Sequence, residues 1–302
     1  KYLKKDSVDE FYTDDNDVTR YHKIINIIDG FFQPLSNHIQ LEMKLSLMIR
    51  KGYVGRNIKK GDLQKRLIAG YEQIKSGSDM VQFGDIQSTA QSTLFIGGSG
   101  LGKTAVLNRL LASYPQVIYH PKYNQVQLTY IKVDCPHDGT LKSLCIHFFT
   151  EIDKALGTKY QVATERWGIE KLVSYMAQVA TKYAIGILVI DEIQNLKVAK
   201  TGGKEKMLSF LGRLVNVINI PVLLVGTPKA KQIMMDNFMY ARRSTGAGTL
   251  EWAPLKTSVQ KKQIGISSRS EWNAFTDRLW NKQFLHKALD KLSEEIRDTW
   301  FE

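Results

Sequence analysis

Short apolar runs alternate with amphipathic stretches through the middle of the chain. The apolar runs predict five β-strands, at residues 93–96, 128–133, 185–190, 222–225 and 249–252. The stretches between them repeat apolar residues at helical spacing and predict helices at residues 103–112, 141–156, 169–183 and 204–218. Strands and helices that alternate in this way form a parallel sheet with helices on both faces. The pattern therefore predicts an α/β fold with a five-stranded parallel sheet flanked by helices.

The two ends of the chain have a different pattern. Residues 1–29 mix charged and aromatic side chains with little periodicity, and we interpret them as an arm or partner-facing segment. Two apolar helical faces follow on either side of a glycine-containing loop at 51–57, made by Leu41, Leu45, Met48 and Ile49 and by Leu63, Leu67 and Tyr71. After the core, a basic linker at 256–269 leads to a helix that we expect Ser270 to cap.

These patterns divide the chain into three expected parts. They are an N-terminal arm and helical region at 1–80, the α/β core at 81–255, and a linker with a partial helical lid at 256–302. The chain begins without Met, and it stops soon after a new helix begins at Ser293. We therefore expect the sequence to be a piece of a longer protein, with its lid truncated.

Composition narrows the class of protein. At 43% hydrophobic and 24% charged residues the chain is typical of a soluble globular protein, and its longest apolar runs, such as 187–190, are too short to span a membrane. Cys135 and Cys145 are too few for a disulfide framework, which favours a reducing cytoplasm. The net charge of +12 favours a polyanionic partner, nucleic acid above all, although a solvated lysine-rich surface is the alternative.

The segment between the first two predicted core elements carries a phosphate-binding motif. Residues 97–104 read GGSGLGKT and match G-x-x-x-x-G-K-[ST] between a strand and a helix. Glycines let the backbone N–H groups surround the β-phosphate of ATP, Lys103 reaches the β- and γ-phosphates, and Thr104 ligates Mg²⁺. The predicted nucleotide-binding residues are Gly97, Gly98, Ser99, Gly100, Leu101, Gly102, Lys103, Thr104 and Ala105. The alternative is a chance glycine loop.

A second motif ends the third predicted strand. The apolar run 187–190 is followed by Asp191 and Glu192, the Walker B pattern. A buried strand delivers Asp191 to the edge of the sheet beside the phosphates, where it joins Thr104 as a metal-binding residue. Glu192 is then placed as general base for the attacking water, which predicts ATP hydrolysis. The alternative is a strand that simply ends in a charged turn.

Two further catalytic assignments depend on these motifs. Thr227 follows the apolar run 222–225 and is the expected sensor of the γ-phosphate or the lytic water. Arg242 and Arg243 follow a helical stretch on the C-terminal side of that strand. Where neighbouring subunits share a nucleotide, a residue at such a position supplies an arginine finger to the site of the adjacent subunit. A surface basic pair is the alternative for the two arginines.

Basic and aromatic residues outside the motifs are candidates for contacting a DNA backbone. They lie in two segments, with Tyr119, His120 and Lys122 in one and Lys197, Lys200 and Lys204 in the other. A solvated charge run is the common alternative for either segment. A zinc site at Cys135-Pro-His137 and Cys145-Ile-His147 is disfavoured, because this spacing is unusual for ligands and Cys145 lies on an apolar helical stripe.

With these motifs in place, the sequence resembles TnsC, the AAA+ ATPase regulator of heteromeric cut-and-paste transposons. The resemblance runs from about Phe31 to the C-terminus, and it includes segments that generic ATPases lack. The similar segments are FFQPL (31–35), YVGRN (53–57), GDLQK (61–65), STAQS (88–92), YPQVIYH (114–120), LVIDEIQ (188–194), GTPKA (226–230) and ARR (241–243).

The resemblance implies an AAA+ P-loop NTPase fold and a mechanism. ATP-bound subunits would assemble as rings or helical filaments on double-stranded target DNA in the bacterial cytoplasm or nucleoid. A target-selection protein would load them, and they would recruit and activate the transposase subunits. ATP hydrolysis with Mg²⁺ would then disassemble the complex. The chain stops inside the lid, so we expect the transposase-binding tail and any lid arginine sensor of the family to lie beyond Glu302.

Two other functions remain open from the sequence. The first is another AAA+ helper that acts on DNA, such as an initiator or a helicase loader. The second is an ATP-gated signalling or scaffold protein that does not need DNA. No membrane association is expected.

Overall fold

A computed structural model describes residues 16, 18–19, 21–22, 25, 30–76, 91–196, 203–231, 248–254, 268–281 and 292–299. The chain forms two compact units. One consists of Leu41–Trp252, and the other combines Lys1–Gln40 with Ala253–Glu302. The three-part domain organisation expected from the sequence remains a prediction.

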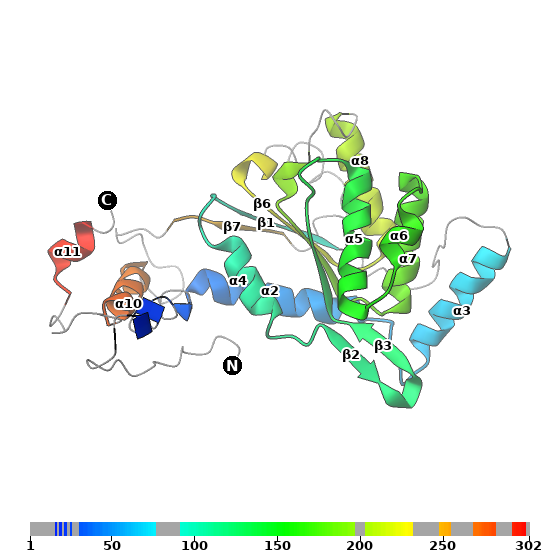
Figure 1. Ribbon diagram of the computed structural model, residues 1–302, viewed down its shortest axis with the longest axis horizontal. Helices are drawn as coiled ribbons and strands as arrows, with labels where there is room; N and C mark the ends of the chain where they lie inside the picture. The colour runs from blue at the N-terminus through cyan, green and yellow to red at the C-terminus, as the bar shows by residue number, and fades with distance from the viewer. Residues whose placement is uncertain are drawn as a thin grey trace. The chain divides into compact units, whose positions relative to one another are not determined.

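The larger unit is built on a five-stranded sheet (Figure 1). Its strands are β1 (Ser92–Gly97), β4 (Tyr130–Asp134), β5 (Ile187–Asp191), β6 (Val222–Gly226) and β7 (Thr249–Trp252). Their order is β4-β5-β6-β1-β7, and every neighbouring pair is parallel. The predicted five-stranded parallel sheet is therefore confirmed. All residues of β1, β5 and β6 are buried, as expected for strands covered on both faces.

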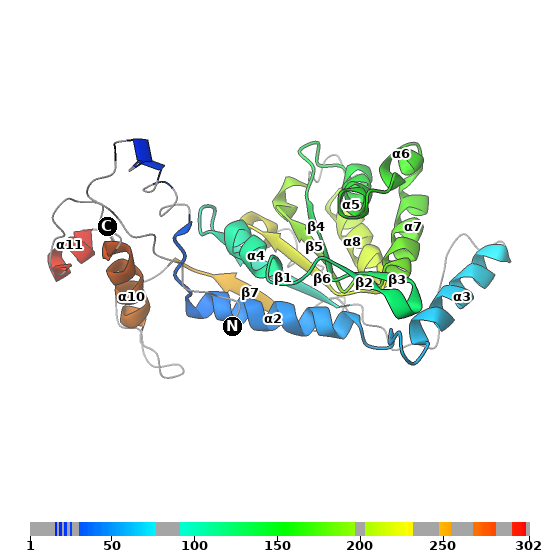
Figure 2. The same ribbon diagram turned by 60° about the horizontal axis from the view of Figure 1, so that its bottom comes forward.

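The helices cover the sheet on both sides. They are α4 (Lys103–Leu111), α5 (Leu141–Leu156), α6 (Tyr160–Thr164), α7 (Ile169–Lys182) and α8 (Lys204–Ile218). The apolar sides of α5, α7 and α8 share one core with alternate residues of the strands, such as Leu188 and Ile190. On the other face lie α4 and the part of α2 (Ser36–Gly52) that begins at Leu41 (Figure 2). The predicted flanking helices are confirmed.

Two predicted strands begin later in the structure than the apolar pattern suggested. The run predicted as a strand at 128–133 is divided, because Leu128 ends a separate strand and β4 begins only at Tyr130. The strand predicted at 185–190 begins at Ile187. Ile185 still belongs to the turn after α7, where its N–H donates to Ala180 O at 2.9 Å and Ala184 has a φ of 44°. Apolar character alone does not separate a buried turn from the strand that follows it.

A hairpin that the sequence did not predict precedes β4. It consists of β2 (Val117–His120), the single turn η1 (Pro121–Tyr123) and β3 (Gln125–Leu128), paired antiparallel. Leu128 N donates to Tyr183 O at 2.8 Å, and Leu128 O accepts from Gly186 N at 3.0 Å, just before β5 begins. The hairpin therefore stands at the amino end of the sheet, opposite the loop that follows β1 (Figure 1).

The loop after α2 is attached to the same end of the sheet by a buried arginine. The Arg56 guanidinium donates to Ile185 O at 3.0 Å and to Asn219 O at 2.7 Å. Burial lowers the pKa of Arg56 to about 10, with the nearby Arg66 charge acting in the same direction. Arg56 thus links the start of β5 to the end of α8. The helix α3 (Asp62–Lys75) follows this loop.

The smaller unit contains α10 (Ser268–Trp280) and α11 (Glu294–Thr299). Arg297 of α11 donates to Thr276 Oγ1 of α10 at 3.1 Å. The prediction that Ser270 caps this helix is wrong, because the helix begins at Ser268 and Ser270 lies in its first turn. No Gly or Pro interrupts residues 268–270, so nothing in that sequence forces a later start. No helix in the described ranges is long and apolar enough to cross a membrane.

Candidate nucleotide-binding site

The loop between β1 and α4 has the backbone that its glycines predicted. Gly100 and Gly102 adopt positive φ angles of 81° and 76°, which non-glycine residues rarely adopt. Gly97 is tightly surrounded, since a Cβ there would lie 3.2 Å from both Lys103 Cδ and Trp252 Cβ. The loop therefore turns sharply from the end of β1 into the N-terminus of α4. Such a terminus has free N–H groups and a positive dipole end suited to phosphate.

Lys103, the first residue of α4, is buried against this loop. Its side chain is 6% exposed, and Nζ donates to Gly98 O at 2.8 Å. A buried ammonium group facing a neutral carbonyl lacks a compensating negative charge at that contact, so the position suits an anionic ligand. The geometry thus fits a phosphate group.

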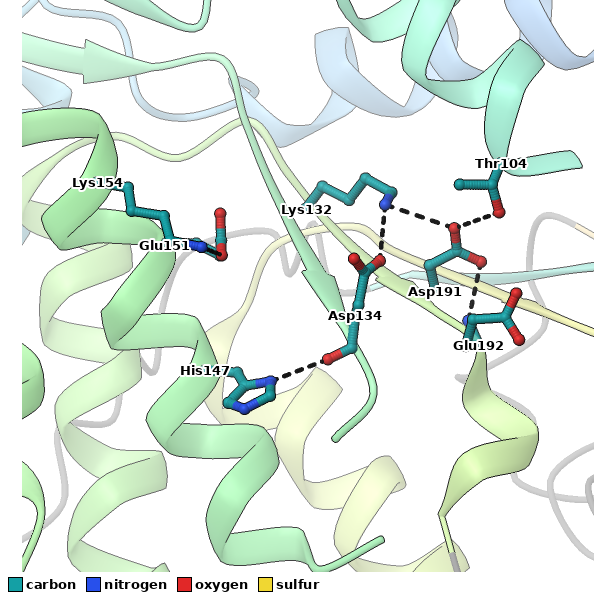
Figure 3. Close-up of polar contacts among 8 residues, drawn as sticks. All are labelled: Thr104, Lys132, Asp134, His147, Glu151, Lys154, Asp191 and Glu192. Carbon is teal, nitrogen blue, oxygen red and sulfur yellow. Dashed lines mark hydrogen bonds and ion pairs between the residues drawn. The ribbon is translucent and has the colours of Figure 1, made fainter. Parts of the chain in front are cut away.

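Thr104 and Asp191 meet across the site (Figure 3). Thr104 Oγ1 donates to Asp191 Oδ2 at 2.9 Å, and the Asp191 side chain is fully buried at the end of β5. Hydroxyl and carboxylate oxygens are the hard ligands that Mg²⁺ prefers. The two predicted metal-binding residues are therefore together, although they are far apart in the sequence.

Lys132 and Asp134 extend this cluster from the neighbouring strand (Figure 3). Lys132 Nζ lies 3.5 Å from Asp191 Oδ2 and 2.7 Å from Asp134 Oδ1. The register of β4 on β5 pairs Asp134 with Asp191, which places both carboxylates at the same edge. Sequence reasoning missed Lys132 and Asp134. The sequence feature that could have revealed them is a pair of charged residues, on either side of a valine, at the end of this strand.

Glu192 has an unusual backbone. Its φ of 55° and ψ of 39° lie in the left-handed region, and its N–H donates to Asp191 Oδ1 at 2.8 Å. A left-handed conformation at a non-glycine residue costs on the order of 1–3 kcal/mol, and such residues cluster at functional sites. The backbone therefore turns at Glu192 and leaves the direction of β5.

The end of β6 lies between the other two motifs. Because β6 pairs with both β1 and β5, Thr227 follows the strand that separates the phosphate-binding loop from Asp191. The Thr227 hydroxyl is buried and has no hydrogen-bond partner among the described residues. Its backbone N–H donates to Gln194 Oε1 at 3.1 Å, and Gln194 Nε2 donates to Glu192 Oε2. Gln194 is a contact that sequence reasoning did not assign.

The predicted DNA-contacting residues of the hairpin lie away from this site. Tyr119, His120 and Lys122 belong to the hairpin at the opposite end of the sheet, where Tyr119 is 55% exposed and His120 Nε2 lies 2.7 Å from Gln127 Oε1. Lys204 is the first residue of α8, but its side chain is not among those that the structure describes. The remaining predicted residues, Lys197, Lys200, Arg242 and Arg243, lie outside the described residues.

The two cysteines of the disfavoured zinc site are buried free thiols. Burial raises the pKa of the Cys145 thiol to about 12. Burial also raises the pKa of Cys135, and the nearby carboxylates of Asp191, Asp134 and Glu192 act in the same direction. His147 Nδ1 lies 3.1 Å from the backbone oxygen of Asp134.

Part of the chain matches a known protein family. A family model described as "AAA domain" matches residues 86–234, slightly less than half of the chain. A search of curated proteins finds no match.

The chain also matches solved structures at low sequence identity and low TM-score. The ORC2 protein of Aeropyrum pernix, solved in ADPNP and ADP complexes, is 13% identical, with a TM-score of 0.38 over 67% of this chain and 49% of that protein. A Walker-type ATPase of Pyrococcus abyssi is 15% identical, with a TM-score of 0.41 over 78% and 61% of the two chains. Cdc6p of Pyrobaculum aerophilum is 14% identical, with a TM-score of 0.34 over 68% and 48%. The chain thus spans about half to three fifths of these proteins.

Proposed function

We propose that this chain, whose core has the AAA+ P-loop NTPase fold with an AAA domain at residues 86–234, is an ATP-hydrolysing switch that assembles on target DNA and regulates transposition. The observation that carries the ATPase part is the 2.9 Å hydrogen bond from Thr104 Oγ1 to Asp191 Oδ2. It joins the phosphate-binding loop to the carboxyl end of β5, with Glu192 as the next residue. A P-loop and an acidic strand end in contact are the elements that phosphoryl transfer requires.

The residues of the loop would bind the nucleotide. Backbone N–H groups of the 97–102 turn and the N-terminus of α4 face the phosphates, and Lys103 exchanges its contact with Gly98 O for phosphate oxygens. Thr104 and Asp191 would hold Mg²⁺, whose charge offsets that of the β- and γ-phosphates when it is bound.

Glu192 would act on water. Its carboxylate follows Asp191 at the same edge of the sheet, and as general base it would take a proton from the water that attacks the γ-phosphate. The Thr227 hydroxyl, for which the described part of the chain offers no hydrogen-bond partner, would bond to the γ-phosphate or that water. Arg242 or Arg243 of a neighbouring subunit would supply positive charge to the transition state.

The DNA and transposition parts of the proposal rest on the sequence. The segments similar to TnsC lie both inside and outside the nucleotide motifs, and the net charge of +12 suits a polyanionic partner. In this proposal ATP-bound subunits form a homo-oligomer on duplex DNA, connect a target-selection protein to the transposase, and leave the DNA after hydrolysis. The hairpin residues Tyr119, His120 and Lys122, and the 197–204 segment, are the proposed contacts with the DNA backbone.

Two substitutions test the ATPase site. Lys103→Ala removes the buried ammonium group, and we expect it to abolish nucleotide binding and assembly on DNA. The matched control is Lys154→Ala, because Lys154 is an exposed lysine paired with Glu151 on α5. Glu192→Gln keeps the shape of the side chain, and we expect it to bind ATP, to slow turnover by about 100-fold or more, and to persist on DNA. Full-speed hydrolysis by Glu192→Gln would rule out the general-base role.

Three measurements test the DNA role. Duplex DNA should stimulate ATP hydrolysis by the parent protein, and electron microscopy should show ATP-dependent rings or filaments on that DNA. If neither occurs, a signalling or scaffold ATPase is the better description. An insertion assay with and without the protein then separates a transposition regulator from an initiator or helicase loader, since only the former is required for insertion.

A further inference from the structure

One side-chain amide connects two catalytic candidates, Glu192 and Thr227, that follow different strands. Gln194 belongs to the single turn η2 (Ile193–Asn195) directly after β5. Its Nε2 donates to Glu192 Oε2, and its Oε1 accepts from the backbone N–H of Thr227 at 3.1 Å. The carboxylate of Glu192, just after β5, is thereby attached to Thr227, just after β6.

The packing around this amide leaves little freedom. A Cβ at Gly226 would lie 2.7 Å from Ile193 Cγ2, 2.9 Å from Ala230 Cβ and 3.0 Å from Gln194 Oε1. Glycine at 226 therefore lets the η2 turn lie directly against the end of β6. The turn is closed by its own backbone, since Asn195 N donates to Glu192 O at 2.8 Å and Leu196 N donates to Ile193 O at 3.2 Å.

The chemistry of the two contacts requires an amide. An ionised carboxylate such as Glu192 only accepts hydrogen bonds, whereas the Thr227 N–H only donates. Glutamine offers a donor and an acceptor at the end of one side chain, so it satisfies both partners at once. Glutamate at 194 would keep the acceptor but lose the donor and add a like charge beside Glu192. Methionine of similar length would lose both.

We propose that Gln194 is a positioning residue for ATP hydrolysis: it holds the Glu192 carboxylate in place and couples it to Thr227 at the end of β6. This inference rests on the proposed function, in which Glu192 is the general base and Thr227 senses the γ-phosphate. Any shift of Thr227 toward its ligand is transmitted to the base through the amide. The nucleotide state that Thr227 senses after β6 therefore sets the orientation of Glu192, the general base, after β5.

The test uses Gln194→Glu and Gln194→Met in the full chain, with duplex DNA present. We measure kcat and KM for ATP hydrolysis, and the Kd for a fluorescent ATP analogue by titration. A misplaced catalytic group costs about 10- to 100-fold in rate, so kcat should fall by that factor in both variants. KM and Kd should stay within about twofold, because neither contact reaches the phosphate-binding loop. The control is Gln161→Ala, an exposed glutamine of α6.

The Glu192→Gln background separates positioning from general damage. Adding Gln194→Met to Glu192→Gln should cause no further loss of turnover, because the group that Gln194 orients is already inactive. Unchanged kcat in both single variants overturns the inference. An equal loss of nucleotide binding and turnover also overturns it, because it would indicate a structural role.

The same set of variants distinguishes this inference from the function beneath it. If Glu192→Gln hydrolyses ATP at the parent rate, the general-base assignment fails and the positioning role fails with it. If Glu192→Gln is slow but both Gln194 variants behave like the parent, only the positioning role fails. A slow Glu192→Gln together with the kcat-only defect at Gln194 supports both.

Discussion

The ammonium nitrogen of Lys132 lies 3.5 Å from Asp191 Oδ2, the same carboxylate oxygen that accepts the hydrogen bond from Thr104. Lys132 reaches this position from β4, while Asp191 ends β5. Asp191 is fully buried, and a buried carboxylate needs a compensating charge or hydrogen bonds. Lys132 therefore supplies part of the balancing charge at the position proposed to hold a metal ion.

We predict that Lys132→Met destabilises the protein. The change leaves Asp191 buried with one fewer positive neighbour, and we expect a loss of about 1–3 kcal/mol in the free energy of unfolding. Urea unfolding followed by circular dichroism measures it. Adding Mg²⁺ and ADP should recover part of the loss, because a cation at Thr104 and Asp191 restores the balance.

The matched control for this prediction is Lys154→Met. Lys154 forms an exposed ion pair with Glu151 on α5, so its loss should change the free energy of unfolding by less than about 1 kcal/mol. If both substitutions lower the free energy of unfolding equally, Lys132 does not stabilise the buried Asp191 carboxylate and contributes no more than a surface lysine.

A second prediction concerns the arginine at the amino end of the sheet. Arg56→Met leaves Ile185 O and Asn219 O without their guanidinium donors. The contact with Ile185 O is buried, whereas the contact with Asn219 O is partly buried. A buried carbonyl that loses its donor costs about 1–3 kcal/mol, so we expect a loss of about that size in the free energy of unfolding, measured by urea titration. Arg56→Lys should be intermediate, because a single ammonium cannot reproduce the forked geometry. Arg166→Met, at an exposed arginine, is the control and should be nearly neutral.

The third prediction is that neither cysteine reacts in the folded protein. Burial raises the pKa of Cys145 to about 12, and burial also raises that of Cys135, so both thiols stay protonated at pH 8. Because the thiolate is the reactive form, we expect no alkylation by iodoacetamide under native conditions and two modified residues per chain in denaturant, counted by mass spectrometry. Rapid modification of either cysteine in the native protein would contradict its buried position.

The same thiols give a pH dependence with a defined sign. Above about pH 8.5 the unfolded chain releases its thiol protons while the folded chain keeps them. The folded state then binds more protons, so the free energy of unfolding falls as pH rises above that value. Urea titrations at pH 7.5 and 9.5 measure the change, and a Cys135→Ala/Cys145→Ala variant should show a smaller one. An equal decrease in that variant would assign the effect to other groups.

The parts of the site that are contiguous in the chain could be predicted from sequence. The Gly97–Thr104 loop and the Asp191-Glu192 pair each combine a local backbone requirement with an apolar strand, and both signals lie within a few residues. The hairpin at 117–128 was missed because its strands are only four residues each, and the 128–133 run crossed the boundary between β3 and β4.

Only the tertiary structure decided which residues meet. The placement of β6 next to β5 brings the Thr227 N–H to Gln194, which also contacts Glu192, and the pairing of β4 with β5 puts Lys132 beside Asp191. The sequence by itself determined the five strands, the phosphate-binding loop and the acidic strand end, because periodicity and glycine positions reflect local backbone needs. The order and register of parallel strands depend on the packing of distant helices and on long connections. For that reason the contacts of Lys132 and Gln194 with the two carboxylates could be read only from the folded chain.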